Sequence, residues 1–264
     1  MPHGRRPPRL ITIPPVADPI LLAVLFFGGA MLYASVGHAG ASAYLAAMGI
    51  LGVSPDVARP TALALNIIVA SFVTFRFWRG GYLSARTLAP FLIGSIPLAY
   101  LGGTLPVAPA VYKQLVGIVL LVAAVGMAST ARRAAQTETG KATPHVPIVP
   151  AVLIGAAIGL LSGLTGTGGG IFLSPILLFT GWAETRAASG VAGAFILGNS
   201  IAGLTGNLAR LASVPPAIPL WEVAVVVGAA IGSEIGGRRG RTYLLRAALS
   251  LVLAIAGLKL IFIG

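Results

Sequence analysis

Ten apolar stretches, separated by short polar loops, occupy nearly the whole of this sequence. The longer ones have about 19 to 22 residues, the length of an α-helix that crosses the roughly 30 Å hydrocarbon layer of a bilayer. Only 9% of the 264 residues are charged, whereas a soluble domain carries about a quarter. The sequence therefore predicts an all-α polytopic membrane protein that is solvated by lipid. The stretches lie at about 19–36, 40–52, 60–78, 87–105, 111–129, 148–164, 169–182, 187–208, 218–236 and 243–263.

The basic residues lie in short clusters between the apolar stretches, as in the topogenic loops of membrane proteins. The formal net charge of +12 would also suit a nucleic-acid-binding protein, but no cluster is interleaved with aromatic side chains on which bases could stack. We therefore predict the lipid bilayer and a small solute as partners, and no nucleic acid. The clusters are Arg5, Arg6 and Arg9; Arg76, Arg79 and Arg86; Arg132, Arg133 and Lys141; and Arg238, Arg239, Arg241 and Arg246.

The two halves of the chain resemble each other. Each has a glycine-rich break between its first two stretches, the first break at 36–40 and the second break at 165–169, and an Asn in its third stretch. Gene duplication explains this order of features, and repeated halves are common in secondary transporters. The predicted organisation is a disordered tail at 1–18, a first transmembrane repeat at 19–129, a polar linker at 130–147 and a second transmembrane repeat at 148–264.

The first two stretches of each half are short, and only the break separates them. Joined as one helix they would be about 50 Å long, too long for a single crossing. A broken or re-entrant pair of helices, whose non-helical backbone is buried in protein or lines a cavity, fits better. If each pair makes one crossing, the chain has about eight spans and parallel halves; if each pair returns to the side it entered, the halves are inverted with three crossings each. The basic loops do not decide, and the short stretches slightly favour inverted halves.

The second break gives the strongest local signal, with five glycines in the eight residues from Gly163 to Gly170. Each glycine costs a helix interior about 1 kcal/mol relative to Ala, so this run interrupts the helix and exposes backbone N–H groups at the next helix start. Such groups bind anions, helped by the helix dipole. Glycines also let helices cross closely, but packing glycines are normally four residues apart. The predicted binding residues are Thr165, Gly166, Thr167, Gly168, Gly169 and Gly170.

The first break supplies hydroxyl groups and one imidazole. An ionisable residue inside the membrane is a functional hypothesis by default. His38 could bind substrate, or take up a proton and couple transport to a gradient; alternatively it is a neutral side chain that hydrogen-bonds a freed backbone carbonyl. The predicted binding residues here are Ser35, Gly37, His38, Gly40 and Ser42.

Three further polar residues lie within apolar stretches. Asn66 and Asn199 either hold helices together or face the substrate, and their paired occurrence makes both of them binding candidates. Glu234 is a second candidate for proton coupling, or else it pairs with Arg238 one turn away.

Matching loops after the second stretch of each half carry one acidic and one basic residue. Asp56 lies near Arg59, and Glu184 lies near Arg186. We expect each pair to form a local ion pair, without a role in transport.

No set of residues in the sequence indicates an enzyme. Asp and Glu total six, mostly in loops, and there is no Gly-x-Ser-x-Gly elbow and no phosphate-binding Gly-Lys-Ser/Thr loop. The sequence has no Cys, and its three His residues are scattered, which argues against a metal site. We predict no catalytic residue, no metal and no cofactor.

The second break carries a resemblance to a known family. Gly163 to Gly170, with Pro175 and Gly181, resembles the Gly-x-Gly-Gly-Gly-x-x-x-x-Pro signature of the sulfite exporter TauE/SafE family. Residues 33–42 resemble the opening motif of one branch of it, and the likeness covers about residues 20–263. The first half departs from the glycine-rich form, with His38 in its break and Ala46 in place of a Pro. The resemblance implies export of small sulfur-containing anions, such as sulfite or sulfoacetate, across the bacterial inner membrane.

The leading hypothesis is a secondary transporter of a small anion, with a binding cavity between the two breaks. A passive anion channel is an alternative, and it requires a continuous polar path. A non-transporting membrane scaffold is another, and it predicts breaks that are packed without a cavity. Substrate, direction, coupling ion and oligomeric state are left open by the sequence.

Overall fold

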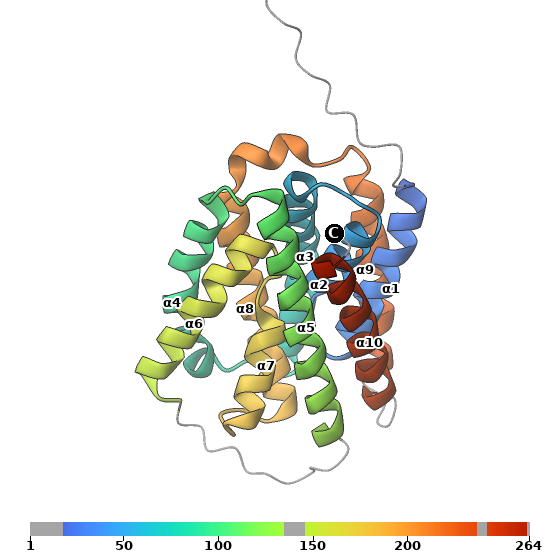
Figure 1. The fold of residues 1–264 in the computed structure, drawn as a ribbon. Coiled ribbons are helices and arrows are strands. Elements are labelled where there is room, and N and C mark those ends of the chain that lie inside the picture. Colours follow the sequence, from blue (N-terminus) through green and yellow to red (C-terminus); the bar gives the residue numbers. More distant parts are fainter. Residues whose placement is uncertain (1–17, 135–145, 237–241, 263–264) are drawn as a thin grey trace, which may run out of the picture.

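The computed structural model describes residues 18–134, 146–236 and 242–262, which form a bundle of helices with no strand among them (Figure 1). The predicted tail up to residue 17, residues 135–145 of the predicted linker, and Arg238 lie outside the described residues. The elements are α1 Pro19–Ser35, α2 Ala41–Ile50, α3 Pro55–Arg79, α4 Ala85–Thr104, α5 Pro109–Ala134, α6 Ile148–Thr165, α7 Gly170–Phe179, α8 Thr185–Gly206, the short 3-10 helix η1 Leu208–Ser213, α9 Ile218–Gly236 and α10 Thr242–Phe262.

Local sequence explains where several helices begin. α1 starts with Pro19, and the side chain of Asp18 accepts a hydrogen bond from the Ile20 N–H at 2.8 Å, which satisfies one of the free donors of the first turn. Ser84 caps α4 in the same way, through the N–H of Thr87. α3 begins at Pro55, five residues before the predicted stretch, with Pro at its start and Asp56 in its first turn.

Six helices among the described residues are long and apolar enough to cross a bilayer, namely α3, α4, α5, α6, α8 and α9. α1 has 17 residues and α10 has 21, which also falls within the length range of spanning helices. By length and composition the described residues hold six candidate spans, fewer than the predicted number of about eight. α2 and α7 have 10 residues each, about 15 Å of helix, so neither crosses alone.

Both predicted helix breaks are confirmed. α1 ends at Ser35 and α2 begins at Ala41, and α6 ends at Thr165 and α7 begins at Gly170. The first break therefore keeps its predicted bounds, and the non-helical part of the second break is 166–169. In the first pair α2 turns back beside α1, as the contact of Gly29 in α1 with Ala43 and Tyr44 in α2 illustrates.

Corresponding helices of the two halves, such as α1 with α6 and α3 with α8, run in opposite directions. α1 lies parallel to α9, since Gly228 packs on Phe27 and Gly232 on Met31. α4 lies parallel to α6 in the same manner. In Figure 1, α1 and α3 run downward while α6 and α8 run upward. This arrangement is the inverted one, which loop charge alone did not select. The duplication itself remains a prediction, with which these matching pairings agree.

Glycines form the contact between α4 and α6. A Cβ atom added to Gly155 would lie 2.9 Å from the Cα of Phe91, and one added to Gly94 would lie 2.9 Å from the Ala156 nitrogen. Backbone therefore packs on backbone along this pair, as small residues permit in membrane helices. The α1–α9 pair repeats the arrangement through Gly228 and Gly232.

Candidate functional site

Both breaks lie inside the protein. Every residue of 36–40 and of 166–169 is buried. Non-helical main chain is therefore enclosed by helices, which is where a membrane protein tolerates it. An exposed turn in either place would have excluded an internal site, and neither break is such a turn.

Three glycines of the second break have left-handed backbone. The φ angles are +86° at Gly166, +76° at Gly168 and +79° at Gly169, and Gly37 in the first break has +80°. Side chains other than glycine rarely adopt this conformation. The consecutive glycines are thus required by the backbone path of the break.

Asn66 of α3 connects the two breaks. Its Oδ1 accepts a hydrogen bond from the Ala41 N–H, at the start of α2, over 3.2 Å. Its Nδ2 donates to Ser200 Oγ of α8 over 3.0 Å, and a Cβ atom on Gly168 would collide with that nitrogen. The start of α2 and the approach to α7 therefore meet at one fully buried amide.

Asn199 of α8 lies beside the second break. Its side chain is fully buried, and neither Oδ1 nor Nδ2 has a hydrogen-bond partner within the described part of the chain. Its Nδ2 would be 3.6 Å from a Cβ atom on Gly169. A buried amide without partners is costly, and water or a polar solute would satisfy it.

His38 joins the two halves from the first break. Its ring is buried, with Nδ1 3.0 Å from the Val36 carbonyl oxygen and Nε2 2.7 Å from Ser174 Oγ of α7. A carbonyl can only accept, so Nδ1 carries a hydrogen. In the neutral ring Nε2 accepts from the Ser174 hydroxyl; in the protonated ring it donates to Ser174.

A small cavity adjoins this histidine. It is lined in part by His38, Ser174 and Ser189, and its volume of about 10 Å³ holds about one water molecule. The second break, in contrast, is closely packed. Cβ atoms on Gly169 and Gly170 would meet Ile158 and Ile196 within 3 Å. The anion-sized cavity expected between the breaks is therefore not open in this structure, within the residues it describes.

The hydroxyl groups of the breaks mostly bind their own helices. Ser35 Oγ donates to the Leu32 carbonyl at 2.6 Å, and Thr165 Oγ1 donates to the Leu161 carbonyl at 2.6 Å. Thr165 Oγ1 also lies 3.0 Å from Thr167 Oγ1. Ser42 is buried in the first turn of α2. Of the predicted hydroxyl donors, Thr167 is therefore the one whose hydroxyl belongs to the non-helical segment itself.

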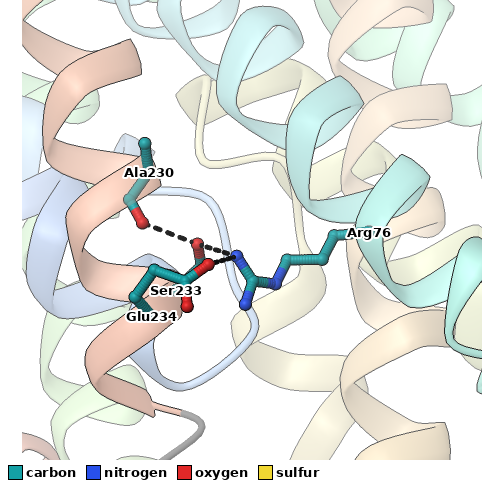
Figure 2. Close-up of polar contacts among 4 residues, drawn as sticks. All are labelled: Arg76, Ala230, Ser233 and Glu234. Atoms are coloured by element: carbon teal, nitrogen blue, oxygen red, sulfur yellow. Dashed lines mark hydrogen bonds and ion pairs between the residues drawn. The ribbon is translucent and has the colours of Figure 1, made fainter.

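Glu234 lies apart from the buried breaks. Its side chain is 75% exposed and forms an ion pair with Arg76 of α3, with Oε1 2.6 Å from Nη1. Arg76 also donates to Ser233 Oγ at 2.9 Å (Figure 2). The structure thus provides an ion-pair partner from another helix, at the adjoining ends of α3 and α9.

The predicted ion pair between Asp56 and Arg59 is wrong. Asp56 Oδ1 instead lies 3.3 Å from Arg210 Nε of η1. Arg59 turns inward, is 2% exposed, and donates from Nη1 to the Leu105 carbonyl at 3.2 Å and from Nη2 to the Gly102 carbonyl. Our sequence reasoning missed Arg59 because it follows a loop, where charges are normally solvated. Pro60 and the apolar residues that follow it were the sequence signal that Arg59 could be buried.

Arg186 contacts the loop between α3 and α4, and the predicted ion pair with Glu184 is not formed among the described residues. Its Nη1 donates to the Tyr82 hydroxyl at 2.7 Å, and its guanidinium lies 5.3 Å from the centre of that ring. Its partner is therefore an aromatic residue of that loop.

Comparison with known proteins assigns the chain to a family. The model of the family described as "Sulfite exporter TauE/SafE" matches residues 21–260. The chain belongs to this family. Within it, the chain is 41% identical to "Probable membrane transporter protein y4hK" of Sinorhizobium fredii, over 93% of this chain and 99% of that one. It is 28% identical to "Probable membrane transporter protein YjnA" of Bacillus subtilis, over 92% and 98%. No solved structure matches. The chain is thus a membrane transporter of the TauE/SafE type, as the glycine motif indicated.

Proposed function

We propose that this protein is a secondary transporter of a small anion, and that it exports sulfite or a related organosulfonate across the bacterial inner membrane. The observation that carries the proposal is the meeting of two interrupted helices at Asn66. Helix starts carry partial positive charge and free N–H groups. Transporters with broken helices use such starts to bind anionic substrate groups near the bilayer centre.

The Asn66 side chain can take the place of the anion as a hydrogen-bond acceptor. Its Oδ1 accepts from the Ala41 N–H, as an oxygen of the anion would. Because the amide is neutral, a sulfite or sulfonate oxygen competes well for the same donor, since hydrogen bonds to ionised acceptors are about twice as strong. Asn199, whose two polar atoms beside Gly169 have no partner among the residues that the structure describes, supplies a second polar group that a bound solute would satisfy.

The close packing of the second break corresponds to a closed state of such a transporter. Alternating access requires a conformation in which the site is sealed, and rocking of one repeat against the other opens it. A passive channel would need a continuous polar path, whereas Ile158 and Ile196 pack against these glycines. A scaffold would share the packing, but membership of a transporter family argues against it.

Flux of labelled sulfite into proteoliposomes tests the proposal. We expect the wild-type protein to accumulate sulfite under an imposed proton gradient, and Gly169→Leu to abolish this flux. The matched control is Gly181→Leu, because Gly181 also has left-handed φ, +70°, but no atom of the described residues would lie within 4 Å of an added Cβ. Both variants are first shown to be monodisperse. Equal flux in Gly169→Leu and the control would exclude the second break as the site.

His38 predicts a pH dependence of the same flux. Its ring is the ionisable group among the residues that line the small cavity, and a proton there adds positive charge near the proposed anion site. Flux of an alkyl sulfonate, whose own charge is constant near neutral pH, should therefore rise as the pH falls on the loading side. His38→Gln, which keeps hydrogen-bonding capacity toward Ser174, should show a flat profile. A variant that follows the wild-type profile would exclude His38 as the proton-binding group.

A further inference from the structure

A buried arginine lies beside the second break. Arg59 is 2% exposed, and no acidic side chain is within ion-pair distance of it in the described ranges. We propose that Arg59 is a substrate-binding residue, which attracts the oxyanion to the second break and binds it by its guanidinium. This inference rests on the proposed function, because it assigns a charge partner to the anion of that site.

The burial of Arg59 calls for a compensating partner. Removing a charge from water is expensive, and buried charges are normally paired. Here the partners are backbone carbonyls of the last turn of α4, Gly102 and Leu105, while the Nε–H has none among the residues described. Carbonyls leave the net charge of the guanidinium uncompensated. An oxyanion supplies both the negative charge and the paired oxygens that a guanidinium binds best.

Arg59 is in direct contact with the second break. A Cβ atom on Gly166 would lie 3.1 Å from the Arg59 carbonyl oxygen and 3.3 Å from its Cγ. The buried Tyr112 donates from its hydroxyl to the carbonyl of Thr165, the residue before Gly166, at 2.8 Å. Arg59 therefore packs directly on Gly166, where the non-helical part of the second break begins.

The two breaks differ at this position. Arg59 is the fifth residue of α3, and Ser189 is the fifth residue of α8. Ser189 packs on Gly37 of the first break and lies 3.3 Å from the Val36 carbonyl oxygen. The matching contacts thus place a permanent cation at the second break and a neutral hydroxyl at the first, where the ionisable His38 is located instead.

The charged neighbours of Arg59 leave its positive charge uncancelled. Asp56 pairs with Arg210, so these two residues and Arg59 together carry a net charge of about +1 at neutral pH. Asp56 and Arg210 are partly exposed, at 67% and 28% of their side chains, and neither hydrogen-bonds to Arg59. Their charges can therefore be changed while the contacts of Arg59 with α4 remain.

A purely structural role for Arg59 makes a different prediction. As a cap of the α4 C-terminus, it would stabilise free carbonyls and the helix dipole. Its loss would then lower stability, and changes of neighbouring charge would leave the KM for the anion unaltered. A binding role makes the KM follow the local charge.

The experiment is a charge series measured by sulfite flux in proteoliposomes, with Asp56→Asn, Arg210→Gln, Arg59→Lys and Arg59→Gln. We expect the KM to fall about three- to tenfold in Asp56→Asn and to rise by a similar factor in Arg210→Gln, with both changes reduced at high salt. Arg59→Lys should transport with a raised KM, and Arg59→Gln should lose flux. The control Arg86→Gln removes an exposed charge from the start of α4 and should leave the KM unchanged.

A KM that stays within twofold of wild type in both Asp56→Asn and Arg210→Gln would overturn the proposal, as would wild-type flux in folded Arg59→Gln. If Arg59→Gln does not fold, the two neighbouring variants decide, because they keep every hydrogen bond of Arg59. Absence of sulfite flux in the wild type would instead refute the proposed function. Normal wild-type flux with a flat charge series refutes the role of Arg59 alone.

Discussion

Asn66→Asp should reduce sulfite flux by at least about a hundredfold, because like charges brought together cost several kcal/mol and each 1.4 kcal/mol is a factor of ten. The substitution is isosteric. An aspartate oxygen still accepts from the Ala41 N–H, and the Ser200 hydroxyl can donate to the other oxygen, so both contacts of this residue persist. The folded structure should therefore be retained while the site acquires a negative charge. The measurement is initial flux, with thermal unfolding in detergent as the check on folding.

The matched control for this variant is Gln114→Glu, which makes the same change from amide to carboxylate at an exposed position of α5. It should transport at the wild-type rate. If Asn66→Asp transports as fast as the control, the start of α2 does not bind the anion. Asn66→Ala adds a second comparison, since it removes the competing amide and leaves the Ala41 N–H available to substrate.

Gly155→Ala should destabilise the protein by about 3 kcal/mol or more, since overpacking of a close contact costs about 1 to 3 kcal/mol even where side chains can adjust. Here they cannot, because the added methyl would meet the carbonyl oxygen and Cα of Phe91, which are backbone atoms of α4. This clash can be relieved only if α4 and α6 separate along their whole contact. The measurement is the apparent Tm in detergent, together with the yield of monodisperse protein.

Gly28→Ala is the control for this second effect. Gly28 also lies inside a helix, α1, but apart from the backbone of that helix no described atom lies within 4 Å of an added Cβ. Alanine should stabilise that helix by up to about 1 kcal/mol relative to glycine. A Tm for Gly155→Ala equal to that of Gly28→Ala would mean that α4 and α6 do not pack backbone to backbone.

The sequence anticipates the expected effects of Asn66→Asp and of Gly155→Ala to different extents. The sequence does not indicate which helix packs on Gly94 or Gly102 of α4. The structure identifies α6 for Gly94 and Gly102, and α9 packs on α1 through Gly228 in the matching pair. Helix partners depend on contacts between segments far apart in the chain, which a single sequence does not report.

The candidate site shows the same division. The glycines of the second break and the polar residues His38, Asn66 and Asn199 were found from sequence because each is out of place in an apolar helix. The contacts that these residues make could not be found from the sequence. Asn66 contacts both breaks, whereas the polar atoms of Asn199 have no partner in the described ranges. Nothing in the two stretches distinguishes one amide from the other. Arg59 was interpreted as a loop charge and is buried.

By itself, then, the sequence determined the properties that depend on composition and local backbone preference. These are the helical membrane class, the two interruptions and the positions that need glycine, because apolar length and left-handed φ are set within a few residues. Only the tertiary structure decided the opposite direction of the two halves, the ion partners of Asp56 and Glu234, and the burial of Arg59. Each of these depends on which distant helix occupies the neighbouring space, and packing of the whole bundle selects that helix.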